Sequence, residues 1–308
     1  MSYPSKVSLT FAGCGGFFAD KSQYQSNFVI TSEAPGKAPR RLLFDCGTDA
    51  KFSLPELGLD ASSFEAVYVS HQHGDHAGGL EWMGFYTYFT GKPKPKLVCN
   101  HGLMGDLWEH GLRGPMSTLP GKVVTLSEYF DCNALPDGGW FYWAGILFRT
   151  IQTVHVVSGF NIKHSYGLIF WPASMRCTSD TSILPRYKGN DDVVVGDEKD
   201  MPAMFDSVPT ETPRVLITGD CRFGSPGLDT AYFQASLILH DCEAAGYRSG
   251  IHPHYDDLKT LPTPHRNKML LYHLGQNSFF TDKEATKDLV TSDGFKGVAY
   301  KHQTLELW

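Results

Sequence analysis

The stretch that decides the fold is Ser70-His71-Gln72-His73-Gly74-Asp75-His76-Ala77-Gly78-Gly79, where three histidines and a carboxylate fall within six positions. It follows residues 66–69 (Ala-Val-Tyr-Val), whose β-branched and aromatic side chains predict a strand. His71 and His73 lie two positions apart in extended chain, so their side chains can point to one side. The side chains of the adjacent Asp75 and His76 diverge as the chain enters a predicted helix. One short loop can therefore supply ligands to two neighbouring metal ions.

The alternative interpretation is a histidine-rich surface loop, or capping and core histidines without a ligand role. The spacing directly behind a strand favours a metal site. The arrangement resembles the metallo-β-lactamase superfamily, whose hallmark is His-x-His-x-Asp-His at a strand end, and all four positions match. The resemblance implies an α/β fold, the four-layered αβ/βα sandwich of that superfamily.

Length and composition are those of an ordinary globular protein. The 308 residues include 42% hydrophobic and 19% charged side chains, and we expect a single domain over 1–308. The chain contains no apolar run of the ~18 residues that a membrane span needs, and it opens without a signal-like segment. We therefore expect a cytoplasmic protein without membrane contact. Seven scattered cysteines without a Cys-x-x-Cys pair predict neither a disulfide framework nor a zinc knuckle.

Charge narrows the class of substrate. The net charge of -6 and the lack of a basic run argue against an extended nucleic acid as partner, because such binding depends on clustered Lys and Arg. A small anionic substrate remains compatible, since two bound cations would dominate the field inside a cleft.

Three more ligand-type residues stand at the ends of predicted strands. His155 lies near the end of the strand at 149–157, and taken alone it would be a core residue. Asp220 closes a Thr-Gly-Asp turn after the strand at 214–217, and its two carboxylate oxygens can reach metals about 3.5–4 Å apart. His273 ends the strand that begins at Met269.

The superfamily resemblance completes two metal sites from these residues. It implies that His71, His73 and His155 hold one ion, that Asp75, His76 and His273 hold the other, and that Asp220 bridges them. His164 is an alternative ligand. Two divalent ions are expected, with Zn²⁺ as the first choice and Mn²⁺ as the alternative. The resemblance also makes Asp45 a candidate support for a ligand histidine, the other interpretation being an exposed turn.

The C-terminal half narrows the resemblance to the tRNase Z-like branch. A strand ends in His240-Asp241-Cys242-Glu243, and Gly250-Ile251-His252-Pro253-His254 precedes a helix-like segment at 255–258. That branch has His-Glu at the first position and a Gly-His-Ser-Thr helix start at the second, so both motifs are altered here. The resemblance covers most of the chain, from residue 12 to His273.

Substrate expectations also come from the resemblance. Bacterial tRNase Z grips tRNA with a glycine-rich basic arm, whereas the excursion at 177–212 is acidic and is expected to be an inserted loop or lid. The compact chain is most similar to phage anti-Pycsar phosphodiesterases, which destroy cyclic CMP and cyclic UMP signals. This implies hydrolysis of 3′,5′-cyclic nucleotides, a homodimer, and the host cytoplasm if the gene is phage-encoded.

The expected chemistry is attack of a metal-activated hydroxide on phosphorus. Asp75 is counted as catalytic as well as metal-binding. His240 or His254 is expected to protonate the departing ribose oxygen, with Asp241 or Glu243 orienting it, and the sequence leaves His252 open as a third candidate. A tRNA 3′-processing endoribonuclease, a lactonase and a metal-free binding module are the alternatives.

Overall fold

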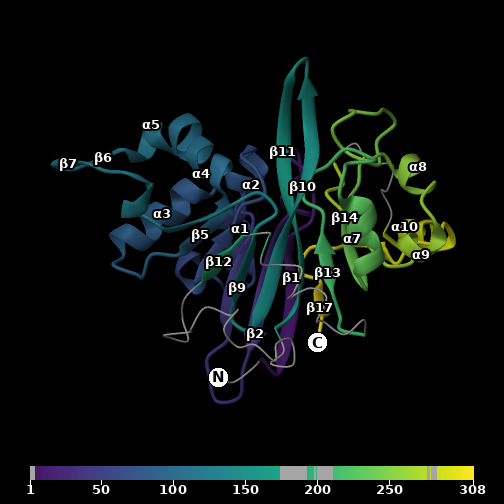
Figure 1. The fold of residues 1–308 in the computed structure, drawn as a ribbon, viewed down its shortest axis with the longest axis horizontal. Coiled ribbons are helices and arrows are strands. Elements are labelled where there is room, and N and C mark those ends of the chain that lie inside the picture. The colour runs from purple at the N-terminus through teal and green to yellow at the C-terminus, as the bar shows by residue number, and fades with distance from the viewer. Residues whose placement is uncertain (1–3, 174–192, 198, 200–210, 276–277, 279–282) are drawn as a thin grey trace.

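Two mixed β-sheets pack face to face, and helices cover their outer sides (Figure 1). The computed structural model describes residues 4–173, 193–197, 199, 211–275, 278 and 283–308. Helices α1 to α5 lie beside one sheet and helices α7 to α10 beside the other (Figure 1). The layers thus follow the order helix, sheet, sheet, helix.

The first sheet contains seven strands of the described chain. Their order is β17 (Thr304–Glu306), β1 (Lys6–Gly13), β2 (Asn27–Glu33), β3 (Arg40–Phe44), β4 (Ala66–Tyr68), β5 (Lys96–Asn100) and β8 (Asp131–Leu135). Strands β3, β4, β5 and β8 run parallel to one another, whereas β2 pairs antiparallel with β3. Residues 70–79 form the histidine loop, and the predicted strand before it is β4. All residues of β4 are buried, as expected for a central parallel strand covered on both faces.

The second sheet contains eight strands of the described chain. Their order is β12 (Val194–Gly196), β9 (Trp140–Trp143), β10 (Ile146–Ser158), β11 (Asn161–Pro172), β13 (Val215–Ile217), β14 (Leu237–Asp241), β15 (Met269–Tyr272) and β16 (Gly297–Val298). Strands β13 to β16 are parallel. Their carboxyl ends therefore meet at one edge, which is where parallel sheets place ligand-binding residues.

The helices are short. Beside the first sheet lie α1 (Ala50–Glu56), α2 (Gly74–Ala77), α3 (Leu80–Phe89), α4 (His101–Leu107) and α5 (Arg113–Met116). Beside the second lie α7 (Leu228–Gln234), α8 (Tyr255–Leu258), α9 (Thr263–Arg266) and α10 (Lys283–Ser292). Single 3-10 or π turns are η1 (Ala61–Ser63), η2 (Trp108–Leu112) and η3 (Leu126–Glu128), and β6 (Thr118–Leu119) pairs with β7 (Lys122–Val123). Among these helices none has the length and apolar character to cross a bilayer.

Aromatic side chains join the two sheets. Phe28 of β2 meets Tyr272 of β15 edge to face, with ring centroids 5.0 Å apart. Tyr68 of β4 stacks on Phe141 of β9 at 5.9 Å. Such contacts contribute about 0.5–1.5 kcal/mol each beyond the burial of their area. They fix the two sheets against each other at the edge where the histidine loop emerges.

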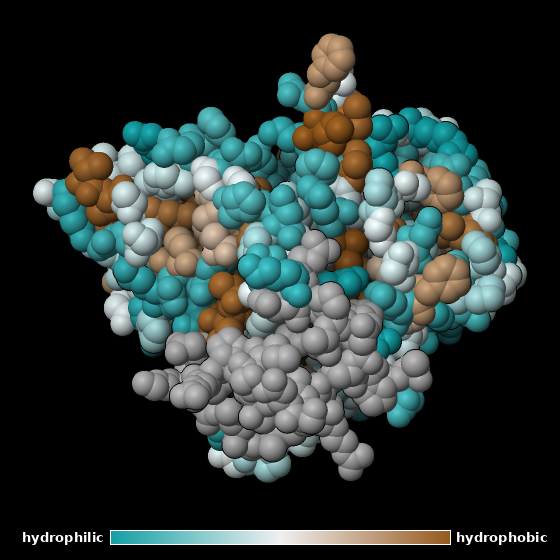
Figure 2. Space-filling model, in the orientation of Figure 1, coloured by the Kyte–Doolittle hydropathy of each residue, from teal (hydrophilic) through white to brown (hydrophobic). Residues whose placement is uncertain are grey.

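A long hairpin of β10 and β11 rises beyond the rest of the molecule (Figure 1). Its tip exposes Val157, Phe160 and Ile162, and it is apolar in the space-filling view (Figure 2). The register of the pair shifts between Val154 and Val156, so His155 is the extra residue of a β-bulge. A bulge re-aims the side chain it carries, and here it directs His155 to the sheet edge.

The excursion expected at 177–212 lies mostly outside the described residues. Of it, the structure describes Val194–Gly196, which pair with β9 as strand β12, and the adjoining Asp197, whose backbone carbonyl accepts a hydrogen bond from Trp140 Nε1 at 3.0 Å.

Candidate metal centre

The histidine loop is held from behind by Asp45, which is fully buried after β3. Its Oδ1 accepts a hydrogen bond from the Ser70 backbone N–H at 2.7 Å, and its Oδ2 accepts one from the Ser70 hydroxyl at 2.8 Å. The same Oδ2 lies 2.7 Å from His76 Nδ1. Asp45 therefore supports the loop and is not an exposed turn residue. Its backbone takes a φ of +61°, a costly conformation for a residue other than glycine.

Three strands of the second sheet bring ligand-type residues to this loop. His155 comes from the bulge of β10, Asp220 follows β13, and His273 follows β15. The turn before Asp220 needs Gly219, whose φ is +62°. His273 itself has a φ of +67°, and its backbone N–H donates to the Cys14 carbonyl at 2.7 Å. The strain is located at the site, where such conformations tend to gather.

The first cluster consists of His71, His73, His155 and Asp220. His73 Nδ1 lies 3.1 Å from both His71 Nε2 and His155 Nε2. Asp220 Oδ2 lies 3.8 Å from His71 Nε2 and 3.6 Å from His155 Nε2. Ligands about 2.0–2.1 Å from a tetrahedral zinc ion are about 3.3 Å apart. The four side chains thus frame a space of that size.

The second cluster consists of Asp75, His76, Asp220 and His273. Asp75 Oδ2 lies 3.2 Å from His76 Nε2 and 3.3 Å from His273 Nε2. Asp220 faces both histidines, with Oδ2 at 3.3 Å from His76 Nε2 and Oδ1 at 3.5 Å from His273 Nε2. Because Asp220 belongs to both clusters, the seven residues form one continuous centre.

Burial keeps the imidazoles of the first cluster neutral. It lowers the pKa of His71 well below its usual value, lowers that of His73, and lowers that of His155 to about 4. Neutral imidazole is the form that binds a metal. In the second cluster burial alone would lower the pKa of His76, but the charges of Asp220, Asp75 and Asp45 raise it well above normal. The protein thus gathers negative charge where a cation would sit.

The donor set fits metal ions on the protein's own geometry. His76 Nε2 and Asp220 Oδ1 are buried polar atoms without a hydrogen-bond partner, which is costly unless another group satisfies them. Three imidazole nitrogens face one another in the first cluster. They cannot all be satisfied by hydrogen bonds among themselves, because each such bond needs one nitrogen with a hydrogen and one without. Divalent cations would satisfy all of these atoms at once.

The ring nitrogens that face away from the centre also contact protein oxygen atoms, as is usual around metal ligands. His155 Nδ1 lies 3.1 Å from the Ile251 carbonyl, and His273 Nδ1 lies 3.4 Å from Asp241 Oδ1. These contacts, with that of Asp45 on His76, direct each Nε2 atom to the centre. His164 is absent from the ligand clusters of the described residues, and its Nδ1 lies 3.2 Å from the Thr153 carbonyl.

The structure does not bring His240 and His254 to the cavity beside the centre. His240 is buried, with Nε2 2.6 Å from the Tyr232 hydroxyl and Nδ1 2.6 Å from a backbone carbonyl. His254 caps helix α8 through Nδ1, and its Nε2 lies 2.9 Å from the Ala245 carbonyl. Both side chains therefore have structural partners on both nitrogens, and neither lines the cavity.

Of the three candidate proton donors, His252 is the one that lines the cavity. Its Nδ1 lies 2.9 Å from Asp241 Oδ2 and 4.0 Å from Asp220 Oδ2. Although burial opposes it, the charge and hydrogen bond of Asp241 raise the pKa of His252 to about 9. Asp241 thus favours the protonated form of this imidazole. Glu243 also lines the cavity, and its Oε2 accepts a hydrogen bond from the Ser249 backbone at 2.8 Å.

A cavity of about 660 Å³ opens onto the centre. His73, Asp75, His155, Asp220 and His273 form its floor. Its walls include three exposed aromatic side chains that the sequence did not single out, which are Phe17, Phe18 and Tyr247. The glycines directly before them, Gly15-Gly16 and Gly246, were the only available signal, and they do not distinguish a binding site from a surface loop.

Comparison with solved structures shows the fold. The metallo-β-lactamase fold protein YhfI from Bacillus subtilis superposes with a TM-score of 0.64 at 15% identity, over 98% of this chain and 100% of that one. The short form of human tRNase Z superposes with a TM-score of 0.59 at 14% identity, over 98% and 99% of the two chains. The expected metallo-β-lactamase fold is confirmed.

Sequence relatives show the family. A protein named anti-Pycsar protein Apyc1 from Saccharibacillus brassicae is 35% identical over 164 residues, which are 53% of this chain and 63% of that protein. Its namesake from Bacillus phage vB_BveM-Goe7 is 26% identical over 284 residues, which are 88% and 90% of the two chains. The alignment thus spans less than two thirds of the first relative and most of the second. The family model described as anti-Pycsar protein Apyc1 matches residues 7–192 and 203–305, and the chain therefore belongs to the Apyc1 family of anti-Pycsar proteins.

Proposed function

We propose that this chain is a metal-dependent phosphodiesterase that opens 3′,5′-cyclic nucleotides to nucleoside monophosphates and so counteracts a cyclic-nucleotide antiviral defence. The anti-Pycsar name of its relatives supports the biological role. The observation that carries the chemistry is Asp220, whose carboxylate belongs to both ligand clusters on the floor of a cavity of mononucleotide size.

The ligand sets are those expected from the sequence. His71, His73 and His155 would hold one divalent ion, Asp75, His76 and His273 the other, and Asp220 both. When bound, such a pair lowers the pKa of a water molecule to near neutrality and neutralises phosphate oxygens. The imidazole-rich donor set favours zinc. The protein's own part is to fix these donors before the substrate arrives and to line the cavity around the phosphodiester.

Proton donation to the departing ribose oxygen belongs to His252 in this proposal. Asp241 engages its Nδ1, so Nε2 is the atom that can face a substrate in the cavity that His252 lines. A protonated imidazole at neutral pH suits this role. Asp241 then acts as a positioning residue that fixes the ring and stabilises its charge.

The decisive experiment incubates the purified protein with 3′,5′-cyclic CMP, UMP, AMP and GMP, a precursor tRNA and an acyl-homoserine lactone. Products are separated by chromatography with and without a chelator. We expect monophosphates from the cyclic nucleotides, no turnover with chelator, and a loss of at least ~10²-fold in Asp220→Asn and Asp75→Ala, because transition-state charge stabilisation by such ions amounts to several kcal/mol. Asp229→Asn, an exposed position on α7, serves as the matched control.

Two outcomes would contradict the proposal. Cleavage of the tRNA or the lactone alone would assign the centre to another substrate. Turnover that survives both the chelator and the Asp220 substitution would remove the two-metal mechanism itself.

Metal identity, assembly and location are part of the same proposal. We expect zinc in elemental analysis of the purified protein, with manganese as the alternative, a homodimer in sedimentation, and action in the cytoplasm, where cyclic-nucleotide signals are formed. Manganese-only reactivation of the stripped protein would reverse the metal assignment.

A further inference from the structure

Phe17 and Phe18 present bare aromatic surface at the mouth of the cavity. They are 52% and 75% exposed, and both line the cavity whose floor is the ligand centre. Their rings meet edge to face, with centroids 5.0 Å apart. Two adjacent exposed phenylalanines beside a charged floor are unusual on a protein surface, because their apolar area gains nothing from water.

The loop that carries the two rings is held in place. The Gly16 N–H donates to the Leu274 carbonyl at 3.2 Å, and the Ala19 N–H donates to the Gly16 carbonyl at 2.9 Å. Gly16 passes so close to His273 that a β-carbon there would lie 3.2–3.4 Å from its backbone oxygen and ring. The loop is therefore fixed against a residue of the ligand centre.

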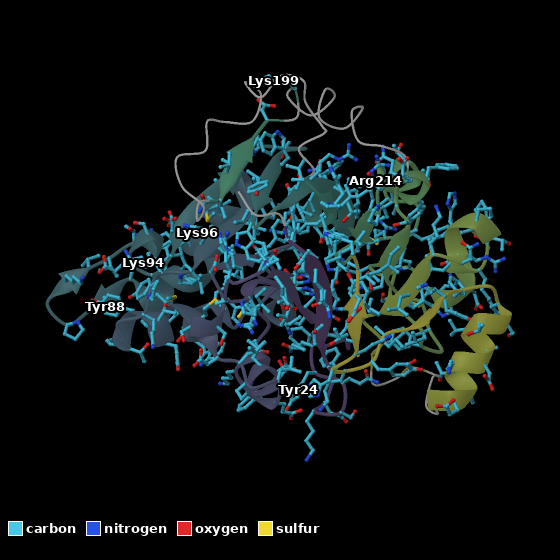
Figure 3. All side chains as sticks on the ribbon, turned by 90° about the horizontal axis from the view of Figure 1, so that it is seen from below. Tyr24, Tyr88, Lys94, Lys96, Lys199 and Arg214 are labelled. Carbon is cyan, nitrogen blue, oxygen red and sulfur yellow. The ribbon has the colours of Figure 1, made fainter. Side chains whose placement is uncertain are left out.

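The far end of the loop is also anchored. The Tyr24 hydroxyl donates to Glu56 Oε1 at 2.8 Å, and Lys301 Nζ contacts Glu56 Oε2 at 2.9 Å. Figure 3 shows Tyr24 at the edge of the molecule opposite Lys199. Anchors on both sides fix the loop that carries Phe17 and Phe18.

Phe17 also touches the metal-binding loop. One carbon of its ring lies 3.5 Å from the position that a β-carbon of Gly74 would occupy, and Gly74 separates His73 from Asp75. A flat group stacked on the face of one ring and touching the other ring would thus stand beside the ligand centre. Tyr247, 58% exposed, lines the same cavity from the second half of the chain.

We propose that Phe17 and Phe18 form the platform on which the base of the nucleotide stacks while its phosphate lies at the ligand centre. The inference rests on the proposed function and names its substrate class more closely, as monomeric nucleotides that carry an aromatic base. Stacking on aromatic side chains tolerates every base, because each base has a π-face. The platform therefore selects nucleotides over base-free sugar phosphates and discriminates little among bases.

Binding measurements on the metal-loaded protein test the platform without relying on turnover. Calorimetry compares CMP, the expected product, with ribose 5-phosphate, which has the sugar and phosphate but no base. Phe18→Ala and the double variant Phe17→Ala/Phe18→Ala remove the platform, and Phe18→Trp restores an aromatic face. Phe160→Ala, at the tip of the β10–β11 hairpin, is the matched control, since that side chain is also fully exposed and does not line the cavity.

We expect the unaltered protein to bind CMP at least ~10-fold more tightly than ribose 5-phosphate. Removing the platform should weaken the binding of CMP about 10- to 100-fold, which is the range that alanine substitution gives for a stacked base. The affinity for ribose 5-phosphate should stay unchanged. Phe18→Trp should keep the affinity for CMP, and Phe160→Ala should change neither ligand.

Equal affinity of the unaltered protein for the two ligands, or no binding of CMP, would overturn the platform. An equal loss of affinity for CMP and for ribose 5-phosphate in Phe18→Ala would also overturn the platform, because the rings would then only support the histidine loop. Hydrolysis of cyclic nucleotides by the unaltered protein is scored separately, so that failure of the proposed function and failure of the platform give different results.

Discussion

Asp241 holds His252 by a single contact of 2.9 Å, and a prediction about leaving groups follows from it. His252→Ala should lower kcat on a 3′,5′-cyclic nucleotide about 10²–10⁴-fold, because the ribose alkoxide needs a proton as it departs. The same variant should change the turnover of bis-p-nitrophenyl phosphate by less than about 10-fold, since p-nitrophenolate leaves without one. Steady-state kinetics on both substrates measure the difference.

His254→Asn provides the comparison for this prediction. Asparagine keeps a side-chain cap for helix α8, so the fold should survive. If His254 were the proton donor, this variant and not His252→Ala would show the leaving-group dependence.

Asp45 determines which nitrogen of His76 faces the centre. In Asp45→Asn the side chain has one oxygen and one N–H₂ group in place of the two carboxylate oxygens. If the N–H₂ group takes the place of Oδ2, it donates toward His76 Nδ1, and the hydrogen of the imidazole ring then lies on Nε2. We expect zinc affinity to fall about 10–100-fold, the usual effect of losing such a partner, with little change in the circular dichroism spectrum.

Competition with a chromophoric chelator measures the affinity of Asp45→Asn, and Asp131→Asn, an exposed residue of β8, is the control. Wild-type zinc affinity in Asp45→Asn would show that the contact does not orient His76.

At this scale the sequence predicts the ligands better than the proton donor. Six of the seven ligand-type residues stand in one contiguous motif or just after a strand, where orientation follows from the end of the strand, and the seventh, His155, lies at a bulge near the end of β10. His240 and Asp241 are neighbours in β14, so their side chains point to opposite faces, and Asp241 faces the centre. Alternation puts His240 on the face opposite Asp241, and in the structure its Nε2 lies there 2.6 Å from the hydroxyl of Tyr232 on α7.

At the scale of elements, the turn after β3 packs against the helix that carries Asp75 and His76. A β-carbon on Gly47 would lie 2.2 Å from the Asp75 carbonyl oxygen, so Gly47→Ala must push α2 away. We expect a loss of about 1–3 kcal/mol in the free energy of unfolding, together with weaker metal binding. Chemical denaturation and chelator competition measure the two effects.

Gly105→Ala is the matched control for this substitution. Gly105 lies in helix α4, and nothing lies within 4 Å of its β-carbon position. Alanine there should stabilise the protein by about 0.5–1 kcal/mol and leave metal binding unchanged. Unaltered metal affinity in Gly47→Ala would show that the packing of the turn does not position the ligands.

The strands were largely predictable as elements, and their fine geometry was not. Short apolar runs before His71, Asp220 and His273 predict β4, β13 and β15, because buried parallel strands are continuously apolar. The bulge at His155 depends on the register of β10 against β11, and a single sequence does not encode that register in a readable way. The aromatic walls of the cavity depend on loops meeting in space, which periodicity does not report.

At the scale of the whole molecule, the ligand centre joins the two sheets. Asp75 and His76 follow β4 of the first sheet, whereas His155, Asp220 and His273 come from the second. Ions bound there as proposed would stabilise the packing of one sheet on the other, by about 2.7 kcal/mol for each site at a metal concentration of 100 Kd. We expect calorimetry to show one cooperative transition whose Tm falls by about 5 °C or more on chelation.

Asp220→Asn should abolish most of this dependence of Tm on zinc. The variant thereby distinguishes the effect of metal binding on Tm from general effects of the chelator. Two resolved transitions, only one of them sensitive to metal, would contradict the prediction of a single domain over 1–308.

The pairing of β17 with β1 has a consequence for how the protein is made. Thr304–Glu306 form the edge of the sheet that opens with Lys6–Gly13, and His273 completes a ligand set that begins at Asp75. A ribosome exposes the early strands long before their last neighbour leaves the exit tunnel. If the centre binds two ions as proposed, its second ligand set is completed only after nearly the whole chain has emerged, so we expect a nascent chain halted before His273 to bind the second ion more weakly than the released protein.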